Sequence, residues 1–256
     1  MNWTRQQLLI AYYLYWEIPF GKMHSKNPMI IEFAGLIGRT PSALAMKLSN
    51  IASLDSRITS TGRSGLRGAS SADREMWAEM DADYDAFVLQ LNGAISQLSK
   101  VEPPRKIEPD LEDIDYTGKN RVVLTTARER QDVFRDAVLS AYDYRCCISG
   151  LSNPRLLVAS HIVPWRVRES TRLNPGNGLS LSLLHDKAFY IGLITINEDM
   201  TVRVSKKGIE TADQFYRDTI LSYDGQAISM PGKFAPHAEF LAYHRDEVFE
   251  KTRGRA

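Results

Sequence analysis

The sequence has few of the features expected of a secreted or membrane protein. Only two cysteines occur among 256 residues, and they are adjacent, at Cys146 and Cys147. This spacing suits neither a disulfide framework nor a Cys-x-x-Cys half of a structural zinc site. The longest early apolar run, residues 8–16, has about half the length needed to cross a bilayer, and no small-residue cleavage site follows it. We therefore expect a cytoplasmic protein without a membrane partner.

The sequence also has no excess of charge of either sign. The 32 Lys and Arg residues are balanced by 31 Asp and Glu residues, which gives a net charge of +1. An anionic ligand would therefore have to be bound by a local basic surface. The apolar fraction of 43% is ordinary for a soluble globular protein, and the length suffices for one large domain or two smaller ones.

A charged, proline-containing segment, residues 100–121, divides the sequence. It contains three prolines and few large apolar residues, so it can bury little apolar surface and its prolines interrupt regular structure. We predict a helical domain at residues 1–100, a linker at 101–120 and a second domain at 121–256. A tether of this kind would permit some motion of one domain relative to the other.

The N-terminal part contains a pattern typical of two short helices joined by a tight turn. Apolar residues recur at helical spacing over residues 30–37 and 44–51, and Thr40 is a good N-cap for the second helix. The pair resembles a helix-turn-helix. In such a unit Arg39 and Lys47 would face outward, where they could contact phosphates and base edges of DNA. The alternative is a plain helical hairpin with a solvated face.

A segment rich in Gly, Ser and Thr, residues 57–72, follows these helices. It contains Arg57, Arg63 and Arg67. A flexible backbone with spaced guanidinium groups can follow a phosphate backbone. We expect these arginines to contact DNA, and an ordinary surface loop is the alternative.

The C-terminal part is predicted to contain strands and helices around two histidines. A long helix is expected at about residues 126–142. The apolar run at 156–159 predicts one strand, and the alternating Leu and Ser residues at 179–183 predict a second. A helix at 185–190 and a strand at 193–196 complete the unit. The expected fold class is α+β, with a mainly helical N-terminal domain.

His161, Asn177 and His185 have the side chains that phosphodiester hydrolysis requires. An imidazole at the end of the first strand, His161, can take a proton from an attacking water. The carboxamide of Asn177 can fix that ring or its loop, because it donates and accepts hydrogen bonds without adding a charge. His185, at the start of a helix, can ligate a metal through a neutral ring nitrogen. We expect both imidazoles to face one scissile phosphate.

The segment from Tyr144 to Val204 resembles the HNH endonuclease family, in its branch of predicted restriction endonucleases. The matching elements are Cys-x-Ile-Ser-Gly at Cys146, Ser-His-Ile-x-Pro-Trp at Ser160, Asn-Gly-Leu at Asn177 and Leu-His-Asp-Lys-Ala-Phe at Leu184. The resemblance implies a ββα-metal fold, with His161 as general base, Asn177 as organiser of the loop and His185 as metal ligand.

Two positions depart from the family pattern. Many members have Asp or His immediately before the base, where this chain has Ser160, and often Asp after the helix Phe, where it has Tyr190. A hydroxyl such as that of Ser160 is a weak second ligand for Mg²⁺ or Zn²⁺. Three accounts stay open: one divalent ion held by His185, waters and substrate phosphate; ligation by another carboxylate such as Asp186; or a weakened or inactive site. The expected ion is Mg²⁺ or Mn²⁺, with Zn²⁺ or Ni²⁺ as alternatives.

The resemblance implies a metal-dependent DNA endonuclease of restriction or defence type. Double-stranded DNA is the expected partner, and the N-terminal domain would recognise a sequence or a modified base. A homodimer is expected, because cleavage of both strands by a one-metal site usually needs two copies. The alternative is a DNA-binding regulator or defence effector with a degenerate, weakly active or inactive HNH module.

Overall fold

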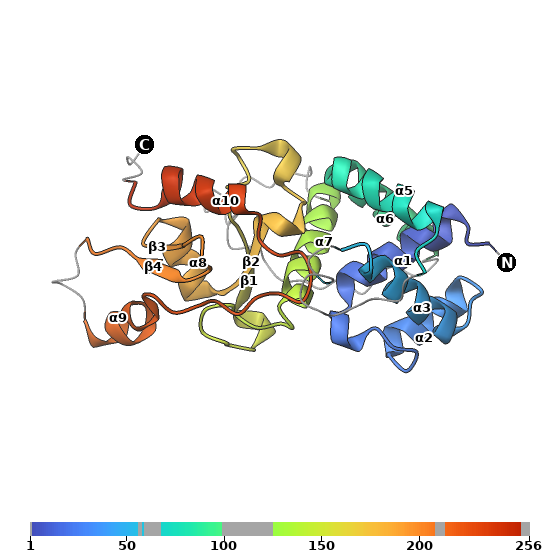
Figure 1. Ribbon diagram of the computed structural model, residues 1–256, viewed down its shortest axis with the longest axis horizontal. Helices are drawn as coiled ribbons and strands as arrows, with labels where there is room; N and C mark the ends of the chain where they lie inside the picture. Colours follow the sequence, from blue (N-terminus) through green and yellow to red (C-terminus); the bar gives the residue numbers. More distant parts are fainter. Residues whose placement is uncertain (1, 56–57, 59–67, 99–124, 208–212, 252–256) are drawn as a thin grey trace.

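The fold was described from a computed structural model. The residues described are 2–55, 58, 68–98, 125–207 and 213–251, with no side chains described at 125–131 and 169. The predicted linker at 101–120 lies outside these residues, as do Arg57, Arg63 and Arg67. Helices dominate the N-terminal part, and short strands occur only in the C-terminal part of the described chain (Figure 1). The fold class is α+β, as predicted.

The N-terminal part is built from helices that begin at good capping residues. They are α1 (Arg5–Glu17), α2 (Pro28–Leu36), α3 (Pro41–Ala52), α5 (Ser71–Ala82) and α6 (Tyr84–Leu98). The side chain of Thr40 accepts a hydrogen bond from the amide of Ala43 at 3.2 Å, so α3 begins at the predicted N-cap. Between α2 and α3 the chain turns at Gly38, whose φ of 65° favours glycine.

The C-terminal part contains two antiparallel hairpins and several helices. They are α7 (Thr125–Ala141), β1 (Leu157–His161), β2 (Gly178–Ser182), α8 (Leu183–Tyr190), β3 (Ile194–Ile196), β4 (Val202–Val204), α9 (Gln214–Thr219) and α10 (Ala238–Tyr243). In the first hairpin His161 pairs with Gly178, and Leu157 pairs with Ser182. Each predicted strand and helix of this part is present, with ends that differ by one or two residues.

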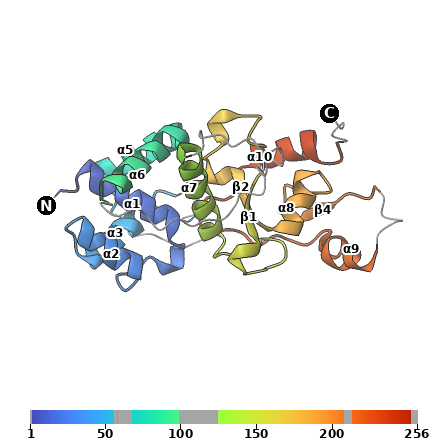
Figure 2. The same ribbon diagram turned by 180° about the vertical axis from the view of Figure 1, so that it is seen from behind.

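Helix α7 lies between the N-terminal helices and the β1–β2 hairpin (Figures 1 and 2). It packs against α1 and α6 and also against both strands. A Cβ atom on Gly178 would lie 2.3 Å from Cγ2 of Val138 and 3.1 Å from Cζ of Phe134, both on α7. The glycine of the Asn-Gly-Leu motif is therefore the residue that allows the hairpin to approach α7.

Buried contacts join the N-terminal helices to the C-terminal part. One hydrophobic cluster includes residues of α1, α7 and the hairpin. The buried ammonium of Lys233 donates to the carbonyl groups of Tyr15, Trp16 and Ile18 at the end of α1. The hydroxyl of Ser140 donates to the carbonyl of Trp16 at 2.5 Å. Motion of one part relative to the other would have to break these contacts.

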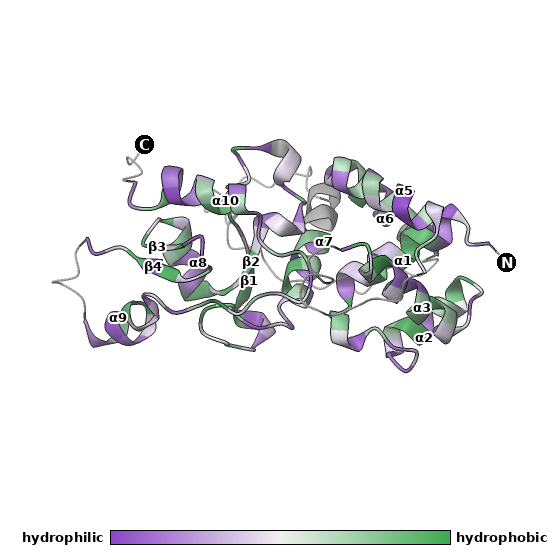
Figure 3. Ribbon diagram, in the orientation of Figure 1, coloured by the Kyte–Doolittle hydropathy of each residue, from purple (hydrophilic) through white to green (hydrophobic). Residues whose placement is uncertain are grey.

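Hydrophobic residues occur in the N-terminal helices and in the β1–β2 hairpin (Figure 3). Over the described residues, no helix has both the length and the apolar character that a membrane span requires.

Candidate active site

His161 lies at the end of β1, opposite the first residue of β2. Its ring stacks on Phe134 of α7, with centroids 4.1 Å apart and planes 8° apart. Trp165 meets the same ring edge-on at 5.5 Å. The Nε2 atom donates a hydrogen bond to the carbonyl of Arg172 at 2.8 Å. These contacts hold the imidazole in one orientation.

The surroundings of His161 keep its ring neutral. Burial lowers the pKa of His161 to about 4, and the hydrogen bond to the carbonyl of Arg172 only partly opposes this shift. A carbonyl is solely an acceptor, so Nε2 carries the proton and Nδ1 has the lone pair. None of the described residues is hydrogen-bonded to Nδ1. A neutral imidazole in this state can accept a proton at Nδ1.

Asn177 is fully buried and closes the loop that follows His161. Its Oδ1 accepts from the amide of Val163 at 2.8 Å. Its Nδ2 donates to the carbonyl groups of Val163 and Thr171, at 3.2 Å and 3.1 Å. These are contacts that an organiser of the loop would make, and a catalytic role for Asn177 remains a prediction.

His185 is buried at the start of α8, with 4% of its surface exposed. Its Nδ1 atom lies 2.9 Å from Oγ of Ser182 and 3.6 Å from Sγ of Cys146. Its Nε2 atom donates to the carbonyl of Thr219 at 2.9 Å. The ring of Tyr223 meets the imidazole edge-on at 5.2 Å. Both ring nitrogens of His185 therefore have partners within the protein.

Cys146 belongs to the same buried cluster. Burial raises the pKa of its thiol, but hydrogen bonds with His185 and Ser149 have the larger effect and lower the pKa to about 6. The contact between Cys146 and His185 was not predicted from the sequence. The Cys-x-Ile-Ser-Gly motif indicates this cysteine but not which side chain its sulfur contacts.

The surroundings of the predicted ligands, His185 and Ser160, do not fit a metal site. A metal needs a lone pair on a ring nitrogen of His185, and both nitrogens are hydrogen-bonded. Within the described residues, no group of three or more His, Cys, Asp or Glu side chains could hold a metal ion. His185 and Ser160 are therefore not assigned as ligands.

The two imidazoles also lie at different ends of the hairpin. His161 pairs with Gly178 at one end, and Ser182, the N-cap of α8, pairs with Leu157 at the other. At about 3.4 Å per residue, four steps along β2 separate these ends by about 13 Å. The rings of His161 and His185 contact no residue in common. The expectation that both face one phosphate is not supported.

Lys47 does not face outward as predicted. It is buried, and its ammonium lies 2.8 Å and 2.9 Å from the two carboxylate oxygens of Asp73 on α5. Asp73 has no exposed surface, and a buried carboxylate requires a partner of opposite charge. The expected contact of Lys47 with DNA is therefore withdrawn.

Arg39 is half-buried and bound to the start of the chain. It donates to the carbonyl of Asn2 at 2.6 Å and to Oε1 of Gln7 at 2.8 Å. Its guanidinium also lies over the ring of Trp3, 4.7 Å from the centroid. Contact of Arg39 with a phosphate would compete with these interactions.

A basic loop that was not among the predicted sites lies between His161 and Asn177. Arg166 and Arg168 are exposed there. Arg172 lies over the ring of Trp165 and donates to its carbonyl at 2.9 Å. The signal was present, because residues 166–172 contain three arginines directly after the Ser-His-Ile-x-Pro-Trp motif.

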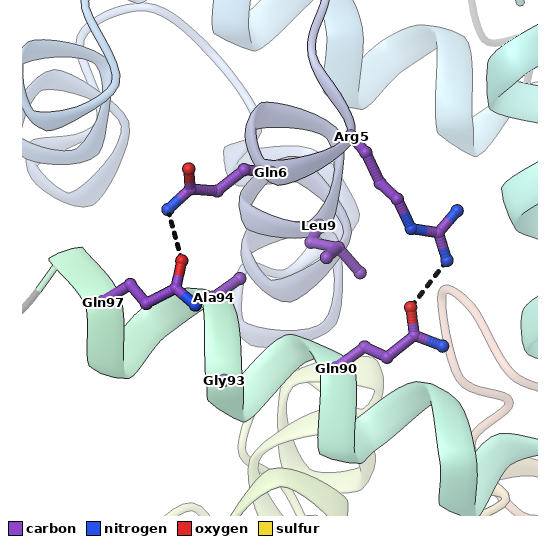
Figure 4. Close-up of a pocket in the computed structure, with 7 residues that line it drawn as sticks. All are labelled: Arg5, Gln6, Leu9, Gln90, Gly93, Ala94 and Gln97. Carbon is purple, nitrogen blue, oxygen red and sulfur yellow. Dashed lines mark hydrogen bonds between the residues drawn. The ribbon is translucent and has the colours of Figure 1, made fainter.

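A groove lies between α1 and α6, in the N-terminal part (Figure 4). Arg5 donates to Gln90 at 2.6 Å, and Gln6 donates to Gln97 at 3.1 Å. These pairs link the two helices across the groove. No histidine, cysteine or carboxylate lines it, so we assign no chemistry to it.

A hairpin followed directly by a helix, with a histidine at the end of the first strand and a buried asparagine opposite, forms a ββα unit. Residues 146–197 match the family model described as HNH endonuclease, so this part of the chain is similar to that family. A comparison with curated proteins finds no match. The chain thus carries an HNH-type nuclease domain, for which DNA is the implied substrate.

Proposed function

We propose that this protein is a DNA endonuclease that hydrolyses phosphodiester bonds with His161 as general base. The observation that supports this role is the state of its ring, which is neutral and fixed through Nε2 with the Nδ1 lone pair available. A general base in this state can take a proton from the attacking water. General-base catalysis contributes roughly 10²- to 10⁴-fold to the rate.

The neighbours of His161 would position the base and the substrate. Phe134, Trp165 and the carbonyl of Arg172 orient the imidazole. Arg166 and Arg168 are exposed on the loop that Asn177 closes, and we propose that they contact DNA phosphates. Arg57, Arg63 and Arg67 are proposed as further contacts on the basis of the sequence.

HNH nucleases generally use a divalent metal ion. We propose Mg²⁺ or Mn²⁺ as the ions that support cleavage, with Zn²⁺ and Ni²⁺ as alternatives. Since the described residues do not supply the predicted ligands, we assign no catalytic step to the ion.

We further propose a restriction or defence role in the cytoplasm, with the N-terminal helices recognising a sequence or a modified base. The support is the combination of an HNH segment with a separate set of helices that includes the α2–α3 pair. Cleavage of both strands would need two copies of the domain, so we propose a homodimer on DNA.

The test is cleavage of plasmid DNA, modified and unmodified, with each of the four ions and with EDTA. We expect His161→Ala to lower the cleavage rate about 10²- to 10⁴-fold. His24→Ala is the matched control, because His24 is exposed in the N-terminal part. A His161→Ala protein that cuts like the wild type would remove His161 from the role of base.

A second function is favoured by specific residues. Ser160 stands where many family members have Asp or His, Tyr190 stands where they often have Asp, and the nitrogens of His185 are occupied. A DNA-binding regulator or defence effector with an inactive HNH module would have these features. Binding of DNA without cleavage under any of the four ions would support this second function.

A further inference from the structure

His185 joins three segments that are far apart in the sequence. Its ring contacts Cys146 before the hairpin, Ser182 at the end of β2 and Thr219 at the end of α9. The imidazole is buried, and the ring of Tyr223 packs perpendicular to it. The arrangement depends on hydrogen bonds at both ring nitrogens.

The Nδ1 atom is part of the N-terminal cap of α8. Ser182 is the N-cap, and its hydroxyl accepts a hydrogen bond from the amide of His185 at 3.2 Å. The same hydroxyl lies 2.9 Å from Nδ1, and Sγ of Cys146 lies 3.6 Å from it. The hydroxyl and the sulfur both lie within hydrogen-bonding distance of Nδ1, so the nitrogen is occupied.

The Nε2 atom caps the opposite end of another helix. Thr219 is the last residue of α9, and the final carbonyl groups of a helix have no partner within it. The Nε2–H group of His185 donates to the carbonyl of Thr219 at 2.9 Å. A cation at Nε2 would remove this proton and leave the carbonyl without its donor.

We propose that His185 is a structural tie and not a metal ligand in this HNH domain. Hydrogen bonds with Cys146, Ser182 and Thr219 occupy both ring nitrogens, so neither is left for the cation that the family pattern would place on this histidine. The inference concerns the same site as the proposed function and rests on it only in treating residues 146–197 as the nuclease domain. Its tests use no DNA, so a failure of the proposed cleavage and a failure of this inference can be distinguished.

The first test is NMR of the full chain with ¹⁵N-labelled histidine. His185→Gln assigns the His185 signals among those of the five histidines. We expect an Nε2–H proton on His185 that persists, and signals that neither shift with Zn²⁺ nor broaden with Mn²⁺. A saturable shift or broadening of the His185 signals would overturn the proposal. The result depends on the spectrum of the wild type. It therefore holds even if the His185→Gln variant is partly unfolded, because that variant serves only to assign the His185 signals.

The second test compares stability and metal binding in Ser182→Ala. We expect a thermal midpoint lower by about 2–8 °C, because the cap of α8 and the partner of Nδ1 are lost together. Ser42→Ala, at an exposed position of α3, is the control and should change little. Equilibrium dialysis with Mn²⁺ should give the same binding in wild type and Ser182→Ala. A tighter Mn²⁺ site in Ser182→Ala, or an unchanged midpoint, would contradict the tie.

Discussion

His161 and His185 lie in one small domain but differ in the hydrogen bonds that their ring nitrogens make. Within the part of the chain that the structure describes, His161 is hydrogen-bonded through Nε2 alone, to the carbonyl of Arg172. In His185 both nitrogens have partners, supplied by Ser182, Cys146 and Thr219. The same side chain is therefore suited to proton transfer at one position and to holding the fold at the other. At the residue scale, the difference comes from the hydrogen bonds and not from the residue type.

The protonation of His161 predicts how stability depends on pH. The pKa of His161 is about 4 in the folded protein, below its ordinary value of 6.5. Between these values the unfolded chain binds more protons than the folded one, so stability is fully present above about pH 6.5 and is lost as the pH falls towards 4. The loss attributable to this residue should be on the order of 1–3 kcal/mol.

Urea unfolding between pH 4 and pH 8 checks this prediction. His161→Asn should flatten the dependence, whereas His24→Asn, at an exposed position, should leave it unchanged. Equal slopes in wild type and His161→Asn would mean that the ring is not buried in its neutral form.

The side chain of Asn177 holds the loop between β1 and β2 at several points. It makes hydrogen bonds with the backbone of Val163, near the start of this loop, and of Thr171, further along it. The backbone is thereby fixed while Arg166 and Arg168 remain exposed. At the scale of the element, the loop is suited to presenting two cations beside His161.

The exposed arginines predict how DNA affinity depends on salt. Each phosphate contact contributes about −0.9 to the slope of log affinity against log salt concentration. Arg166→Ala with Arg168→Ala should therefore make the slope shallower by about 1.8 if each arginine contacts one phosphate. Binding at several salt concentrations, measured by fluorescence anisotropy, gives the slope.

The matched control for this experiment is Lys22→Ala with Lys26→Ala. Both lysines are exposed in the N-terminal part, and the substitution removes the same charge. An equal change of slope in the two double variants would show a general effect of charge. An unchanged slope in the arginine variant would remove this loop from the DNA contacts.

The two parts of the molecule are joined by more than the chain between them. Helix α7 packs against α1 on one side and against β1 and β2 on the other. Lys233 extends from the C-terminal part to the carbonyl groups at the end of α1. Burial lowers the pKa of this lysine to about 7, and its three acceptors are main-chain groups that have no partner within α1. At the scale of the whole molecule, the helices and the nuclease domain are coupled.

Removal of this buried lysine should loosen the coupling. Lys233→Met keeps the length of the side chain but removes the donor to the carbonyl groups of Tyr15 and Ile18, whereas the carbonyl of Trp16 keeps its bond from Ser140. We expect the free energy of unfolding to fall by about 1–3 kcal/mol, because unsatisfied buried carbonyl groups are costly. Hydrogen exchange should accelerate at the end of α1. Lys26→Met, at an exposed position, is the control, and unchanged stability in Lys233→Met would contradict the coupling.

Local signals in the sequence were enough to predict much of the fold. Three of these signals depend only on neighbouring residues: the N-cap at Thr40, the alternation of Leu and Ser in β2, and the helical spacing of α7. The HNH segment was predicted in the same way, because its motifs follow one another at fixed spacing. Such patterns act over a few residues, so an unaligned sequence contains them.

The partners of individual side chains could not be predicted, because they come from distant segments. Lys47 turns inward because Asp73 on another helix is buried and needs a cation. Spacing along α3 alone had suggested that this lysine faces the solvent.

By itself the sequence determined the class of the domain, the positions of its helices and strands and the histidine at the end of β1. The tertiary structure alone decided what each ring nitrogen contacts. Thr219 lies 34 residues from His185, yet its carbonyl occupies Nε2. A hydrogen bond depends on distance and direction in space, and spacing along the chain fixes neither for segments that meet only after folding.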